Sequence, residues 1–152
     1  MKINLKVILG GGLAMYVAQF ALSMITGPVI HEGVLTELYQ ANAQFWRPEL
    51  NQQPPDMAAL MPRWIAVGLI ASFILAGIYD NVRSALDGSA LLRGAKYGVI
   101  LFLVNLCISA GWSGVFNLPD AIWLWWNAEG LLVYVVGGAV LGWVTGKLAP
   151  EN

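Results

Sequence analysis

The chain has very little charge. Only 11% of its 152 residues are Asp, Glu, Lys or Arg, whereas a water-soluble domain carries about 25%. So few charged side chains cannot cover a water-soluble surface, which excludes an ordinary soluble domain. The formal net charge of -1 also argues against a nucleic-acid partner, because such a partner requires a basic face.

Cysteine and histidine are almost missing as well. Cys107 is the only cysteine, so no disulfide can form within the chain, and its apolar surroundings indicate a small packed side chain. His31 is the only histidine, and structural metal sites usually combine several His, Cys or carboxylate ligands. The sequence has no Walker loop, nucleophile elbow, CxxC or HExxH motif. We therefore expect no metal site and no cofactor.

Long apolar runs are abundant instead. A helix that crosses about 30 Å of hydrocarbon needs roughly 20 mostly apolar residues, and four segments approach this length, with spans two and three extending into "MAALMP" and "LLRGAK". The runs are continuous rather than alternating, which favours helices over barrel strands. We predict an all-α transmembrane four-helix bundle in a single domain, 1–152, with an outer segment at 31–61 and spans at about 5–30, 62–80, 92–113 and 119–145.

The orientation follows from the basic residues between these spans, because cytoplasmic loops are enriched in Lys and Arg. Arg47 and Arg63 lie on one side of the membrane, and six basic residues lie on the other: Lys2, Lys6, Arg83, Arg93, Lys96 and Lys147. We therefore expect both termini in the cytoplasm of a bacterial inner membrane. Lys2 and Lys6 before an apolar run are also compatible with a signal peptide, although that run is long for one.

The outer segment contains an amphipathic pattern, "HEGVLTELYQANAQFWRPE". Its apolar residues fall on one stripe of a helix, and Pro48 would end that helix. This pattern is typical of a helix lying at the membrane interface. It would act as a lid over the bundle, or else gate a substrate or dock a partner. Asp56 is a suitable N-cap for the run that leads into span two.

Small residues recur at helical spacing. Span four has a glycine at every fourth position: Gly138, Gly142 and Gly146. Span two has the same spacing of small residues at Gly68, Ser72 and Ala76. Small residues let membrane helices approach closely. These stripes would pack the four helices of one chain together, or the span-four glycines would pack against another subunit.

Glu129 is the unusual residue of the last span. An acid at the centre of a membrane helix costs about 2.5–3.5 kcal/mol on insertion scales, but Glu129 lies only about 15 Å along a helix that starts near Pro119 and so falls in the outer half. His31, Arg47 and Arg63 are cations expected at the same level, and Asn127 and Asn105 are possible hydrogen-bond partners. Polar groups from four segments therefore converge under the outer headgroups.

Four interpretations of this polar cluster remain open. It can be a structural knot that holds helices in register, or a ligand pocket between them. It can also be a catalytic or proton-relay site, or, least in keeping with a single histidine, a metal site.

The seven tryptophans allow two interpretations. Trp46, Trp112, Trp123 and Trp126 lie toward the outer face, where an aromatic belt anchors membrane proteins. The same residues can line a pocket for an apolar ligand, most plausibly where Trp112 approaches Trp123.

Four motifs resemble small four-span bacterial membrane proteins classed as being of unknown function: "VIHEGVL", "FWRPE", "RGAKYG" and a glutamate in a glycine-rich last span. The resemblance covers the whole chain. It implies a fold rather than an activity, and marks His31, Trp46, Arg47 and Glu129 as the positions of interest. The long "ELNQQPPDMAALMP" connection and the dense tryptophans depart from it.

These observations favour a non-enzymatic function, as a membrane scaffold or accessory subunit that can bind a lipid-like or small apolar molecule. Its partners would be membrane lipid and either further copies of the chain or a membrane complex. One alternative is a small transporter or proton-coupled carrier. Another is a membrane enzyme acting on lipid or quinone, with Glu129 and His31 as acid and base.

Overall fold

The computed structural model describes residues 3–150, and within this range the chain is all-α, as predicted. It forms five α-helices: α1 (Gly12–Val29), α2 (Thr36–Ala41), α3 (Met57–Val82), α4 (Ala90–Ser113) and α5 (Asp120–Leu148). Helix α1 continues at both ends into π-helical turns, Val7–Gly11 and Ile30–Val34. Short 3-10 turns lie at Ala43–Phe45, Pro48–Asn51 and Arg83–Ala85.

Four of these helical stretches are long and apolar enough to cross a membrane, so the predicted four-span arrangement is confirmed. Helices α3 and α4 begin at Met57 and Ala90, earlier than the apolar runs themselves and as expected for spans that extend into flanking residues. The first span reaches Val34, so His31 lies within its last turns rather than at its end. Lys2, which contributes to the predicted orientation, lies outside the described residues.

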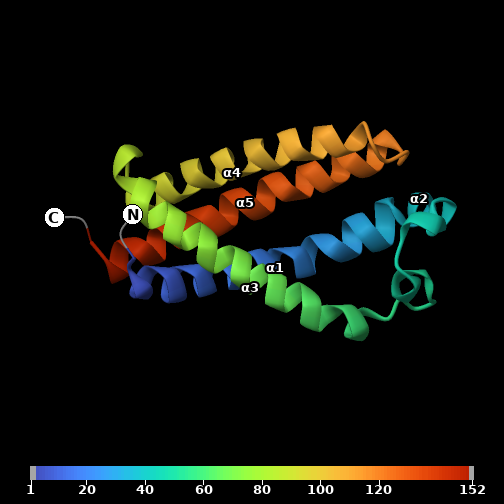
Figure 1. The fold of residues 1–152 in the computed structure, drawn as a ribbon, viewed down its shortest axis with the longest axis horizontal. Helices are drawn as coiled ribbons and strands as arrows, with labels where there is room; N and C mark the ends of the chain where they lie inside the picture. The colour runs from blue at the N-terminus through green and yellow to red at the C-terminus, as the bar shows by residue number, and fades with distance from the viewer. Residues whose placement is uncertain (1–2, 151–152) are drawn as a thin grey trace.

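The helices form an open bundle (Figure 1). Helices α4 and α5 lie side by side along their whole length. Helix α1 contacts α5 and crosses α3, and α3 diverges from α4 and α5. Both chain ends and the α3–α4 connection lie at one end of the molecule, which we call the terminal end. Helix α2 and the chain around it lie at the opposite end, which we call the α2 end.

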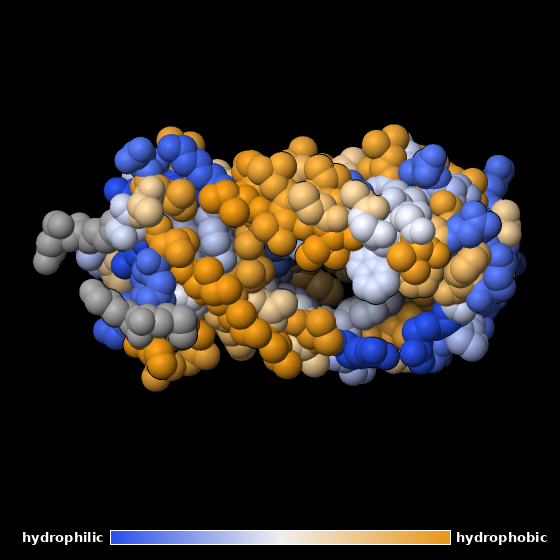
Figure 2. Space-filling view, turned by 45° about the horizontal axis from the view of Figure 1, so that its top comes forward, coloured by the Kyte–Doolittle hydropathy of each residue, from blue (hydrophilic) through white to orange (hydrophobic). Residues whose placement is uncertain are grey.

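The surface matches a chain that crosses a lipid layer. Figure 2 shows a broad apolar band across the middle of the face in view and hydrophilic side chains gathered at both ends. Many large apolar side chains of the spans are exposed, such as Val17, Ile70, Leu103 and Leu124. In water such exposure would be unfavourable, but lipid tails cover it at no comparable cost.

Glycines set the close packing of α4 on α5. A methyl group at Gly94 would overlap the carbonyl oxygen of Gly138, and one at Gly98 would overlap that of Tyr134. Gly142 lies equally close to the backbone of Ala90. The backbones themselves are therefore in contact, and helix α4 occupies the Gly138 and Gly142 face of α5.

Gly146, the last residue of the stripe, lies against the Ala90 side chain. On span two, Gly68 lies under the Tyr16 ring of α1, while Ser72 and Ala76 are buried. Each small-residue stripe thus has a neighbour within the same chain.

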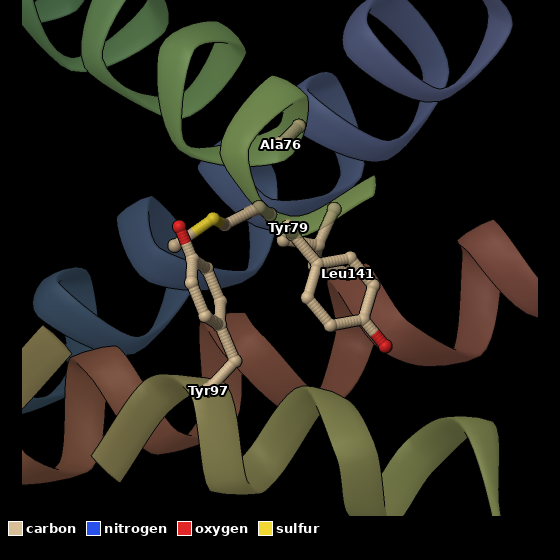
Figure 3. Packing of buried hydrophobic residues seen from close by; sticks show 5 residues of the cluster. Ala76, Tyr79, Tyr97 and Leu141 are labelled. Atoms are coloured by element: carbon tan, nitrogen blue, oxygen red, sulfur yellow. The ribbon is translucent and has the colours of Figure 1, made fainter. Parts of the chain in front are cut away.

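The main apolar core lies toward the terminal end and consists of five buried residues: Met15, Ala76, Tyr79, Tyr97 and Leu141. Figure 3 shows Tyr79 and Tyr97 reaching into the space between their helices. Their ring centroids are 5.2 Å apart, and the Tyr97 hydroxyl donates a hydrogen bond to the Leu75 carbonyl oxygen at 3.0 Å. These two tyrosines join α3 to α4 at this depth.

The outer segment differs from its prediction. We expected one amphipathic helix as far as Pro48, but α2 ends at Ala41 after six residues. Asn42 leaves the helical region (φ -119°, ψ 29°), and its side chain donates to the Leu38 carbonyl oxygen at 2.8 Å. Asparagine competes for backbone groups in this way and disfavours helix interiors. The Asp56 cap is confirmed, because its carboxylate accepts the Ala59 N–H at 3.1 Å.

Candidate functional site

Glu129 meets α1 near the α2 end. Its Oε2 lies 2.9 Å from Nε2 of His31, and its Oε1 accepts a hydrogen bond from the Thr26 hydroxyl. The Glu129 side chain is 13% exposed and that of His31 37% exposed. The carboxylate therefore faces partners from another helix rather than lipid tails, while the imidazole remains partly accessible.

The Tyr39 hydroxyl extends this network into α2. It lies 2.7 Å from Nδ1 of His31 and accepts the indole N–H of Trp126 at 2.7 Å. The backbone carbonyl of Tyr39 accepts the indole N–H of Trp46 at 2.8 Å. One residue of α2 thus connects the histidine of α1 to tryptophans of the outer segment and of α5.

A small apolar cluster positions these groups. Ile30, Leu35 and Ile122 are buried together, and Leu38, Tyr39, Trp46, Leu118 and Trp126 pack around them. The Trp46 ring meets the Tyr39 and Trp126 rings edge to face, with centroids 5.2 and 6.1 Å apart. This packing holds α2 against the start of α5.

Tyr39 remains a phenol in this setting. Burial raises the pKa of its hydroxyl and the negative charge of Glu129 raises it further, while the hydrogen bond from Trp126 lowers it. The net direction is upward from an ordinary value of 10.0. Tyr39 therefore retains its proton and can donate it in a hydrogen bond at neutral pH.

Two of the cations that we expected near Glu129 are elsewhere. Arg47 binds Glu49 at 3.0 Å, and this hydrogen bond raises the pKa of Arg47 and lowers that of Glu49. Arg63 is exposed on α3 and makes no hydrogen bond or ion pair with the described part of the chain. The two predictions are wrong because Arg47 pairs with Glu49 instead and has a side chain that is 55% exposed, and because α3 diverges from α5 at this end.

Asn127, which we expected to bond to Glu129, has its hydrogen-bond partners elsewhere. Its amide donates to the Ser109 hydroxyl at 2.8 Å and to the Trp123 carbonyl oxygen at 2.7 Å. It therefore ties α5 to α4, on the other side of α5 from the contact with α1. Its Oδ1 and the indole N–H of Trp123 are buried without a hydrogen-bond partner in residues 3–150.

A cavity of about 520 Å³ opens between the four spans, and we call it the central cavity. Glu129, Gly130 and Asn127 of α5 line it, with α3 and α4 forming facing walls. Figure 2 shows a hollow near the middle of the molecule. Much of the lining is polar, although it lies at membrane depth: Gln19, Ser23, Ser72, Asn105, Ser109 and Tyr134.

A second cavity of about 320 Å³ lies beside it, nearer the α2 end, and we call it the aromatic pocket. Seven apolar and aromatic residues line it: Phe45, Trp46, Trp112, Phe116, Leu118, Trp123 and Trp126. Trp112, Trp123 and Trp126 line both cavities. The four tryptophans singled out in the sequence therefore gather around one region of the fold.

Sequence reasoning missed Thr26 and the role of the Tyr39 hydroxyl. Thr26 and His31 are five residues apart, which places them about 140° apart around a regular α-helix, so periodicity gives no sign that both reach Glu129. In the sequence, Tyr39 is one of several apolar and aromatic residues of the outer segment. Its spacing from His31 could not identify it, because a turn separates the two residues.

The chemistry of the site is that of a hydrogen-bonded acid and base beside a cavity. The His31–Glu129 contact can hold or pass a proton, and the cavity can hold a molecule against the same carboxylate. Within residues 3–150, no three His, Cys, Asp or Glu side chains gather in a way that could hold a metal ion.

No protein-family model, curated protein or solved structure matches the chain. The resemblance of its motifs to small four-span bacterial membrane proteins stays a prediction. The fold supports an all-α, multi-pass membrane protein with four candidate membrane-spanning helices.

Proposed function

We propose that the protein is a non-enzymatic component of the bacterial inner membrane that binds a lipid-like or small amphipathic molecule in its central cavity. It would act as a scaffold or accessory subunit of a membrane complex, or as a homo-oligomer. The observation that carries the proposal is the cavity of about 520 Å³ between the spans. Ligand pockets typically have about 300–1,000 Å³ and few, well-placed polar groups.

The course of α3 and α4 supports entry from the lipid. Tyr79 and Tyr97 join these helices near the terminal end, and beyond this contact the helices diverge toward the α2 end (Figure 1). The cavity walls on α3 and α4 begin where the contact ends, with Leu75 and Asn105. A molecule with an apolar chain could therefore enter sideways between them.

The buried core disfavours the carrier alternative. Met15, Tyr97 and Leu141 fill the bundle on the terminal side of the central cavity. A transported molecule would have to pass this packed layer. A binding protein needs no such passage.

The membrane enzyme remains a second candidate because of one contact. His31 and Glu129 lie 2.9 Å apart at the edge of a cavity, as an acid and base would. An enzyme would lose turnover of its lipid or quinone substrate on Glu129→Gln while retaining substrate binding, and a binding protein would show no turnover to lose.

The orientation can be tested separately. Lys6, Arg83, Arg93, Lys96 and Lys147 belong to the terminal end, and we propose that this end faces the cytoplasm. A fluorescent protein that matures only in the cytoplasm should be bright when fused after residue 152. Alkaline phosphatase, which is active only outside, should be inactive there and active when inserted at the exposed Gln52–Gln53 turn. The reverse pattern would refute the orientation.

Filling the central cavity should expel its occupant. Ala71 of α3 lines the cavity and is exposed to it, so Ala71→Phe places a ring in the opening. Native mass spectrometry after release from nanodiscs should find a bound molecule on the natural chain, and at least about tenfold less of it on the variant, equivalent to about 1.4 kcal/mol of binding free energy.

Ala66→Phe is the matched control. Ala66 lies on the same helix and is exposed, but it lines neither described cavity. The control should retain the bound molecule in the amount found on the natural chain. A natural chain without any bound molecule, or equal amounts on all three proteins, would refute binding in the central cavity.

A further inference from the structure

The central cavity has an acidic and aromatic lining with no basic side chain. Among the described residues that line it, Glu129 is the only carboxylic acid, and none is Lys, Arg or His. Three are tryptophans, Trp112, Trp123 and Trp126. This composition is informative about the charge of a ligand, because the sign of a buried charge must be matched by its surroundings.

The hydrogen bonds around His31 favour one tautomer of its ring. The indole N–H of Trp126 can only donate, so the Tyr39 oxygen accepts it and the Tyr39 O–H is free to donate to Nδ1 of His31. Nδ1 is then the acceptor of the ring, and Nε2–H donates to Glu129. With a neutral imidazole, each polar group in this series of hydrogen bonds, from Trp126 through Tyr39 and His31 to Glu129, has a partner.

A doubly protonated imidazole fits less well. Its Nδ1–H would also point at the Tyr39 oxygen, and the proton of the phenol would have no acceptor among the described residues. The described lining of the central cavity itself supplies no cation to Glu129. Thr26 and His31 each occupy one carboxylate oxygen, but a carboxylate has about four lone-pair sites.

Other groups of the lining also suit a donor that carries positive charge. The tryptophan rings offer negative faces, and tryptophan is the aromatic side chain that attracts cations most strongly. An apolar remainder of the ligand would contact Leu75, Ile108 and Val133.

We propose that the central cavity binds a lipophilic cation with N–H donors, of the primary alkylammonium class. This rests on the proposed function, since it names the ligand class of the same cavity. The ammonium group would lie at Glu129 and the apolar chain between α3 and α4. A lipid headgroup with a phosphate fits poorly, because no basic side chain of the lining would balance the phosphate charge.

The test compares three probes of equal chain length. Octylammonium, octanol and octanoate are titrated calorimetrically into the natural chain in nanodiscs of uncharged lipid, with empty nanodiscs subtracted to remove partitioning into lipid. Octylammonium should bind at least about tenfold more tightly than octanol, and octanoate should not bind. Glu129→Gln should remove this preference, and Glu37→Gln on the exposed face of α2 should keep it.

The outcomes separate this inference from the proposed function. Equal binding of octylammonium and octanol would overturn the charge preference but leave a cavity that binds amphipathic molecules. The inference would also be overturned if none of the probes bound. The proposed function is decided independently, by the amount of bound molecule that native mass spectrometry finds on the natural chain and on Ala71→Phe. If Glu129→Gln does not fold, Ala71→Phe must abolish octylammonium binding, and retained binding would place the probe elsewhere.

Discussion

Gly98→Ala should lower the free energy of unfolding by about 1–3 kcal/mol, the usual cost of an added group in a well-packed interior. A methyl group at this position overlaps the carbonyl oxygen of Tyr134 and approaches the backbone of Val135. Backbone atoms cannot rotate away as a flexible side chain can, so α4 and α5 must separate. Thermal unfolding in detergent, followed by circular dichroism, would measure the change.

Gly111→Ala is the control on the same helix. An added methyl group there meets no atom within 4 Å, and alanine favours helix over glycine by about 1 kcal/mol. This variant should therefore be as stable as the natural chain or slightly more stable. If both variants shifted the unfolding temperature alike, the effect would reflect helix propensity, and the close α4–α5 contact would not be what stabilises the bundle.

Tyr39→Phe should loosen α2 from the bundle. The substitution keeps the ring and removes the hydroxyl, so the indole N–H of Trp126 and Nδ1 of His31 both lose their partner. An unsatisfied buried polar group costs about 1–3 kcal/mol. Hydrogen–deuterium exchange of the segment 36–51 should become faster, while exchange in α4 and in the terminal half of α5 should not change.

Tyr16→Phe removes a hydroxyl that has no hydrogen-bond partner in the described part of the chain, and it should leave exchange in 36–51 as it is. Tyr16 packs against Gly68 and stacks on Phe20 with its ring, which the substitution retains. Unchanged exchange in Tyr39→Phe would show that the apolar cluster around Leu35 alone holds α2 in place.

The spans could be predicted because their signal is local and strong. Continuous apolar runs locate α3, α4 and α5 to within a few residues, and glycines every fourth residue mark the face of α5 that meets α4. The divergence of α3 from α4 could not be predicted. It begins beyond the contact between Tyr79 and Tyr97, and periodicity contains no information about where two helices separate.

The site was predicted in part. An acid in an apolar span requires a partner, and of the three cations at a similar level only His31 meets Glu129. Arg47 and Arg63 failed as predictions because depth along the membrane normal says nothing about direction around the bundle. The Tyr39 hydroxyl was missed because its contacts join residues 8 and 87 positions apart, and no short pattern spans such separations.

The π-helical turn after α1 decides which deletions the first span can absorb. The Leu35 N–H bonds to the Ile30 carbonyl oxygen five residues back, so the turn holds one residue more than an α-helical turn would. Losing that residue would let the turn close as an ordinary α-helical turn and would leave the direction of the residues after it nearly unchanged. Losing one residue within α1 itself would instead rotate everything after it by about 100°, and a deletion too small to disturb membrane insertion would then turn His31 and Tyr39 away from Glu129.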